Sequence, residues 1–174
     1  MSVHTPEPTA PTAVSHAVDV AAPVEHVFDV FTLQMPRWWD PDHHLLDAVV
    51  DMIVEPRVGG TITEVAATGE RCTFARVLAF DRPTRFAFSW DVSPRWEVET
   101  DPARCSEVHV SFTATGDATT RVVLEHRHLD RHGEGWGGMR DAVGADDGWA
   151  LDLRRFAAVA GEEASRADVE GRTS

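Results

Sequence analysis

Apolar and polar residues alternate along much of the chain, and a period of two predicts strands. The first such stretch is VSHAVDV, in which Val14, His16, Val18 and Val20 share one face. Further alternating stretches lie between residues 48 and 129, separated by short turns rich in Gly, Pro and Asp. We expect an antiparallel meander of six strands there: AVVDMIVEP, TITEVAAT, RCTFARVLAF, RFAFSWDV, SEVHVSFTAT and TTRVVLEHRHL.

Three other segments lack this alternation. In AAPVEHVFDVF, Pro23 stands at a helix start and the apolar residues that follow have helical spacing. LQMPRWWDP then predicts a turn or a second short helix that carries Trp38 and Trp39. After the last strand, apolar residues at three- and four-residue steps predict one long terminal helix: Met139, Val143, Trp149, Leu153, Phe156, Ala157 and Ala160.

This order of elements predicts an α+β fold. A curved antiparallel sheet must cover its apolar face, and only the terminal helix is long enough to do so. We therefore expect a helix-grip fold, with the sheet wrapped around that helix and the two short helices forming the lid of a cavity. The expected single domain covers residues 14–165, and the polar segments 1–13 and 166–174 are expected to be disordered.

Composition narrows the classes of partner. The net charge is −13 and all 16 cationic side chains are arginine, so the surface should repel nucleic acids and anionic lipids. The chain shows neither a secretory signal nor a membrane span, which favours a cytoplasmic protein. Cys72 and Cys105 are expected as free thiols. We expect no cofactor, no metal, and a monomer or weak homodimer.

The hairpin register points to a first candidate site. A tight turn at Gly69 and Glu70 would place Glu64 opposite Arg76, and the next hairpin would place Arg76 beside Trp90. Glu64 and Arg76 would then share a face with large apolar side chains, where an ion pair can anchor a ligand. The alternative is an ordinary cross-strand pair at the open rim of the sheet.

The stretch LEHRHLDRHGEGW holds three histidines. His126 and His128 continue the apolar row that is expected to face inward. A zinc site would need a third ligand, but His132 lies past the strand and the pair His43–His44 lies in a distant loop. Acid/base catalysis by His126, assisted by Glu64, is a second option. Polar wall residues of a mostly apolar pocket are the favoured interpretation.

Tryptophans recur on the segments that would surround the cavity. Trp38, Trp39, Trp90, Trp136 and Trp149 fall on the lid, the sheet or the terminal helix. They suit either core packing or a flat polycyclic or aromatic ligand. The resulting set of predicted ligand-binding residues is Trp38, Trp39, Glu64, Phe74, Arg76, Phe88, Trp90, His126, His128 and Trp149.

Several motifs together resemble the START-like, or SRPBCC, superfamily, in the branch related to the activator of heat-shock-protein-90 ATPase. They are VAAPVEHVFDVFT, WW, EPRVGGTITEV, GERCTFARVLAFDRPTRFAFSW, SEVHVSFTATGDATTRVVLEHRHL and DDGWALDLRRF. The resemblance covers about residues 14–165. It implies a helix-grip fold with a hydrophobic cavity and no universal catalytic residues, and the branch name does not imply chaperone activity.

A narrower resemblance concerns START-like self-resistance proteins of actinomycetes that make enediyne antibiotics. RWWDP, SEVHVSFTAT, TTRVVLEHRHLDRHG and GWALDLRRF are similar to that group, whose members bind the activated drug and are cleaved in place of DNA. A diradical abstracts a backbone Cα hydrogen most easily at glycine. The resemblance thus implies cleavage at Gly133, Gly135, Gly137 or Gly138, with Gly144 and Gly148 farther along the chain.

Three functions therefore stay open. Sequestration of a hydrophobic antibiotic, with self-sacrificial cleavage, leads because nothing in the sequence forms a convincing catalytic set. A polyketide cyclase or dehydratase would need His126 or Glu64 as a proton shuttle. A stress-related co-chaperone would need an exposed partner surface.

Overall fold

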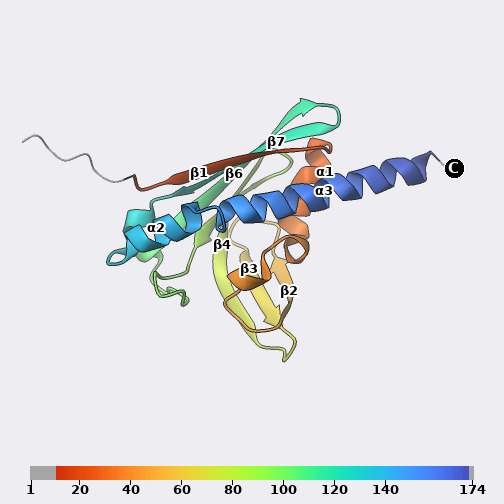
Figure 1. Cartoon of the computed structure of the whole chain (residues 1–174). Helices are drawn as coiled ribbons and strands as arrows, with labels where there is room; N and C mark the ends of the chain where they lie inside the picture. Colours follow the sequence, from red (N-terminus) through yellow and green to blue (C-terminus); the bar gives the residue numbers. More distant parts are fainter. Residues whose placement is uncertain (1–10, 173–174) are drawn as a thin grey trace, which may run out of the picture.

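One curved antiparallel sheet forms most of the protein (Figure 1). The structure, a computed structural model, describes residues 11–172, so the disorder expected for residues 1–10 and 173–174 lies outside the described residues. The strand order is β1-β7-β6-β5-β4-β3-β2. The strands are β1 (Val14–Val20), β2 (Val49–Val54), β3 (Thr61–Ala66), β4 (Arg71–Asp81), β5 (Arg85–Trp90), β6 (Ser106–Gly116) and β7 (Thr119–Arg127).

The predicted helix-grip arrangement is confirmed. The helices are α1 (Val24–Leu33), α2 (Trp136–Gly144) and α3 (Trp149–Gly171), with short 3-10 turns η1 (Met35–Arg37), η2 (Pro41–His43), η3 (Pro102–Arg104) and η4 (Leu129–His132). Helix α3 crosses the sheet and packs against β1 and α1 (Figure 1). None of the helices in the described part has the length and apolar character that crossing a membrane requires.

A cluster of aromatic rings fills the interior near α1. Phe31 of α1 lies 5.6 Å from Phe112 of β6 and 5.1 Å from Phe156 of α3, measured between ring centroids. The ring centroid of Phe86 of β5 lies 6.1 Å from that of Phe31, and all four side chains are buried. Burying each ring stabilises the fold by roughly 2 kcal/mol. This half of the grip is solid, so any cavity must lie at the other end of α3.

The terminal helical segment is broken in two, which the sequence pattern did not predict. A Cβ atom on Gly148 would lie 2.5 Å from the carbonyl oxygens of both Ala142 and Val143. Only glycine permits so close an approach of the start of α3 to the end of α2. The apolar spacing runs through this junction without a change of period, so spacing alone could not reveal it.

Helix α3 also continues past the predicted end of the domain. We expected a disordered tail from residue 166, but the helix runs to Gly171. Residues 165–171 are exposed and lack an apolar stripe, and this part of the helix projects beyond the sheet (Figure 1). Its Glu, Ala and Arg residues have high intrinsic helix propensity. This propensity stabilises the last turns of α3, although no apolar side chains are buried there to reveal a helix in the sequence pattern.

The predicted register of the β3–β4 hairpin is wrong. Ala66 N–H donates to the Glu70 carbonyl, so the loop holds three residues and ends with Gly69 at φ +88°. A register shift beside Ile62 then places Glu64 opposite Cys72. Arg76 lies opposite Thr61, so the predicted Glu64–Arg76 pair does not form.

The next hairpin differs from the prediction for the same physical reason. The predicted pairing of Arg76 with Trp90 implies Leu78 opposite Phe88. Val77 lies there instead, and the register shifts between Val77 and Ala79. A bulge moves one strand by a residue relative to its partner and so changes which side chains are neighbours.

Candidate functional site

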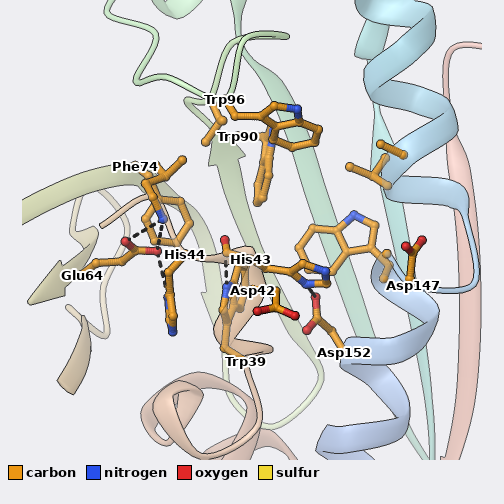
Figure 2. Close-up of a pocket in the computed structure, with 16 residues that line it drawn as sticks. Trp39, Asp42, His43, His44, Glu64, Phe74, Trp90, Trp96, Asp147 and Asp152 are labelled. Carbon is orange, nitrogen blue, oxygen red and sulfur yellow. Dashed lines mark hydrogen bonds and ion pairs between the residues drawn. The ribbon is translucent and has the colours of Figure 1, made fainter. Parts of the chain in front are cut away.

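A cavity of about 490 Å³ opens at the end of the grip away from the phenylalanine cluster. Its walls come from the loop after α1, from strands β3 to β5, from the β5–β6 loop and from the α2–α3 junction (Figure 2). The lining residues are Trp39, Asp42, His43, His44, Leu45, Glu64, Phe74, Trp90, Val92, Trp96, Ala142, Val143, Asp147, Gly148, Trp149 and Asp152.

Indole rings make up one large apolar part of the wall. Trp39 and Trp90 stack at 6.4 Å with an interplanar angle of 26°. Trp149 meets both edge-on, at 5.7 Å from Trp39 and 5.5 Å from Trp90. Phe74 packs beside them, 5.8 Å from Trp39. Such rings present flat apolar surfaces, which suit a planar aromatic guest.

The buried carboxylate of Glu64 holds the lid loop in place. Its Oε2 accepts backbone N–H groups from Leu45 at 3.0 Å and Leu46 at 3.1 Å. Its Oε1 lies 3.1 Å from Nδ1 of His44. These donors compensate the burial of Glu64, which is 1% exposed. Because a carboxylate accepts, His44 donates from Nδ1, which leaves the lone pair of neutral His44 on Nε2.

A second histidine–carboxylate pair joins the lid to α3. Asp152 accepts Asp40 N–H at 3.0 Å through Oδ1, and its Oδ2 lies 3.0 Å from Nδ1 of His43. The hydrogen bond to Asp152 raises the pKa of His43 by more than burial lowers it. The imidazolium form of His43 therefore persists to higher pH than usual, and the cavity wall carries a proton donor.

Behind Trp149 runs a buried hydrogen-bond chain. The Trp149 indole N–H donates to Nδ1 of His126 at 3.1 Å, and Nε2 of His126 lies 2.7 Å from Ser106 Oγ. Ser106 Oγ in turn lies 2.7 Å from Nε2 of His132. Since an indole only donates, neutral His126 carries its proton on Nε2. Burial lowers the pKa of His126 to about 3, so it stays neutral at physiological pH.

The structure brings five of the predicted ligand-binding residues to the cavity: Trp39, Glu64, Phe74, Trp90 and Trp149. His126 faces inward as expected but supports Trp149 from behind instead of lining the cavity. Trp38 and Phe88 are fully buried in the core, where the Trp38 indole donates to the Val30 carbonyl at 3.3 Å. Their ligand-binding roles remain predictions without support from the lining.

Arg76 and His128 lie outside the cavity lining, and their exposed side chains contradict the predicted inward placement. Their ligand-binding roles stay predictions. Arg76 forms a bidentate ion pair with Asp91: its Nε donates to Oδ2 at 3.0 Å and its Nη2 donates to Oδ1 at 3.1 Å. The Arg76 side chain is 40% exposed. His128 follows the end of β7 and has left-handed backbone at φ 61°. This left-handed residue ends the alternation of inward and outward side chains along the strand. The His128 ring is exposed, and its Nε2 lies 3.3 Å from Oε2 of Glu107.

The four glycines predicted as cleavage sites lie outside the cavity lining. Gly133 and Gly135 have φ of +75° and +89° and turn the chain between η4 and α2. Gly137 and Gly138 belong to the first turn of α2. Gly148 does line the cavity.

Sequence reasoning missed His43, His44, Asp152 and Trp96 as wall residues. The pair His43–His44 follows the double tryptophan on the predicted lid, and this position is a sequence signal for a place at the cavity. Asp152 had a clearer signal, because it stands three residues after Trp149 within the apolar stripe of the terminal helix. A carboxylate on a buried helix face must have partners. Among residues 11–172, no group of three or more His, Cys, Asp or Glu is placed to hold a metal ion.

Comparison with known proteins gives one matching family model and several similar solved structures. The family model described as "Activator of Hsp90 ATPase homolog 1-like protein" matches residues 21–161. An anthrahydroquino-γ-pyrone synthase, Txn09, is 38% identical, with 86% of this chain and 96% of that chain covered and a TM-score of 0.62. CalC, a self-sacrificing resistance protein from Micromonospora echinospora, is 31% identical, covering 88% and 96% of the two chains at a TM-score of 0.63.

A third structure, protein NE0264 from Nitrosomonas europaea, is 15% identical and supports the fold alone. The match covers 88% of this chain and 97% of the NE0264 chain, with a TM-score of 0.62. Comparison with curated protein sequences gives no match.

Proposed function

The chain belongs to the family of Activator of Hsp90 ATPase homolog 1-like proteins, and we propose that its cavity binds a planar polycyclic aromatic molecule of polyketide type and closes an oxygen-containing ring on it by proton transfer. The observation that carries the proposal is the arrangement of two histidine–carboxylate pairs beside a wall of indole rings in one cavity (Figure 2).

Size and shape support an aromatic guest. A volume of about 490 Å³ lies within the usual range for small-molecule pockets, roughly 300–1,000 Å³. The stacked pair Trp39 and Trp90, with Trp149 edge-on, offers a planar molecule both flat surfaces and ring edges. Txn09, named as a synthase of an anthrahydroquino-γ-pyrone, supports a fused aromatic ligand of this kind.

The polar groups provide a base and an acid on the same lid loop. His44 is oriented by Glu64 through Nδ1, so the lone pair of its neutral form lies on Nε2 and can take the proton from a ligand hydroxyl. The resulting oxygen attacks a conjugated carbon of the same molecule and forms the new C–O bond. His43, held by Asp152, donates a proton to the carbonyl oxygen as the enol forms. Tautomerisation then restores the ketone, so the reaction is an isomerisation without oxidant or cofactor.

A simple test uses 2′-hydroxychalcone, which isomerises to flavanone through this type of ring closure. We expect the protein to accelerate the reaction, and His44→Gln to slow it on the order of 100-fold while the Kd for the chalcone changes little. His43→Gln should lower the rate as well. His128→Gln is the matched control, because this exposed histidine lies outside the cavity lining.

Two outcomes would contradict ring closure. One is tight binding of the chalcone with no acceleration. The other is unchanged turnover in the double variant His43→Gln/His44→Gln. Either result would leave aromatic binding in place and remove catalysis by the lid histidines.

A second candidate function is self-sacrificial resistance, favoured by a specific observation. Gly148 lines the cavity, so its Cα hydrogens lie where a bound diradical could abstract one. CalC, named as a self-sacrificing resistance protein, supports this candidate. Incubation with an activated enediyne should then cut the chain at Gly148, which mass spectrometry of the fragments would reveal. An intact chain after stoichiometric exposure to the activated drug would remove this function.

A further inference from the structure

One indole of the cavity wall lacks a hydrogen-bond partner. Trp90 is 7% exposed, and its Nε1–H is buried without an acceptor in the described part of the chain. Buried donors are almost always paired, so an unpaired one calls for a functional explanation. The ring cannot turn away to find a partner, because Trp39, Phe74 and Trp149 pack around it at 5.5–6.4 Å.

The neighbouring indoles show what the ordinary arrangement is. Trp39 donates to the His43 carbonyl at 3.4 Å, and Trp149 donates to His126 at 3.1 Å. Trp38, in the core behind them, donates to the Val30 carbonyl. Three of these four tryptophans thus have internal acceptors, and the donor left without one belongs to a cavity wall residue.

We propose that the cavity selects planar aromatic molecules that carry a carbonyl oxygen, and that this oxygen accepts the hydrogen bond from Trp90 Nε1–H. The inference rests on the proposed function and names the ligand feature that the site recognises. The aromatic wall can make apolar contacts with any flat molecule. The unpaired Trp90 N–H favours a molecule that also carries a hydrogen-bond acceptor at its edge. A ligand carbonyl would replace a missing hydrogen bond without displacing an existing one.

Access to this donor requires a movable part of the wall, and Trp96 has the right properties. It stands on the β5–β6 loop, beside Trp90 at the cavity (Figure 2), in the short hairpin closed by the Val92–Val98 bridge. Its side chain is 48% exposed and its backbone adopts a left-handed φ of 61°, which is strained for a bulky residue. A ligand that displaces Trp96 would gain space on the side of the cavity where Trp90 lies, and a ring to stack on.

The experiment compares two neutral probes of nearly the same shape, fluorenone and fluorene, which differ by C=O against CH₂ at one carbon. Equilibrium dialysis gives the Kd of each without relying on tryptophan fluorescence. The wild-type protein should bind fluorenone roughly three- to tenfold more tightly than fluorene. Trp90→Phe keeps an aromatic ring but removes the donor, so it should abolish that preference while fluorene binding stays within about twofold.

Trp136→Phe is the matched control, because it also removes an indole N–H but lies outside the cavity lining. It should keep the preference for fluorenone. Equal wild-type affinities for the two probes, or an unchanged preference in Trp90→Phe, would overturn the inference and leave aromatic binding intact. An equal loss of both probes in Trp90→Phe would also overturn it, because packing alone would then explain Trp90. Failure of both probes to bind the wild type would contradict the proposed function itself.

Discussion

Two buried carboxylates, Glu64 and Asp152, determine which histidines face the cavity. Each is nearly inaccessible, and each pairs with one residue of the adjacent pair His43 and His44. His126 is the opposite case, because its partners are an indole and a hydroxyl. The first arrangement places histidines where they can exchange protons with a guest. The second keeps a histidine neutral as a rigid support for Trp149.

The buried state of His126 predicts a pH dependence of stability. Its pKa in the folded protein is lowered to about 3 from an ordinary 6.5, so below about pH 6.5 the unfolded chain binds a proton that the fold does not. Stability is therefore fully present above that pH and is lost as the pH falls. His126→Gln should remove up to about 1.4 kcal/mol of this loss per pH unit.

Urea unfolding of both proteins from about pH 7 to about pH 5 measures the difference in slope. His43 has a raised pKa, so its contribution is present at low pH and is lost as the pH rises through that pKa. It is common to both proteins and cancels in the comparison. Identical pH slopes for wild type and His126→Gln would refute the assignment of His126 as a buried neutral support.

At this scale the sequence was informative about apolar wall residues and less so about polar ones. Strand parity correctly placed Phe74, Trp90 and Glu64 on the inner face. It failed for Arg76 because a bulge shifted the register, and for His128 because the strand had already ended. The partners of Glu64 could not be predicted, since they come from a loop whose path depends on the pairing itself.

At the scale of the elements, the packing of α2 against α3 depends on the absence of a Cβ atom at Gly148. Gly148→Ala would place a Cβ 2.5 Å from two carbonyl oxygens, so α2 and α3 would have to separate. We expect it to lower the free energy of unfolding by roughly 2 kcal/mol. Gly161→Ala is the matched control, because a Cβ there meets no atom within 4 Å. It should stabilise α3 by about 0.5–1 kcal/mol.

Denaturant titration of the two variants side by side checks this prediction. A neutral effect of Gly148→Ala, together with the expected gain from Gly161→Ala, would mean that the helices do not meet as closely as described. The same pair shows why one continuous terminal helix was predicted. Apolar residues keep their three- and four-residue steps on both sides of Gly148, and periodicity does not record a change of axis.

Taken as a whole molecule, the grip is solid at one end and hollow at the other. Phenylalanines of α1, the sheet and α3 fill the first end. At the second end, indoles and paired histidines surround the cavity. The order of elements was sufficient to predict the fold and the existence of a cavity, because a sheet this curved must wrap its terminal helix. The lining was only partly predictable, since it depends on two loops with little periodic signal.

The most direct test of the account follows the six indole N–H signals in a ¹H–¹⁵N spectrum during titration with fluorenone. We predict that Trp39, Trp90, Trp96 and Trp149 shift along one saturable curve, because all four line the cavity. Trp136, outside the lining, should stay unchanged, and Trp38 should move least among the remaining five. Saturable shifts confined to Trp136, or no saturable shift at all, would contradict an aromatic-binding cavity.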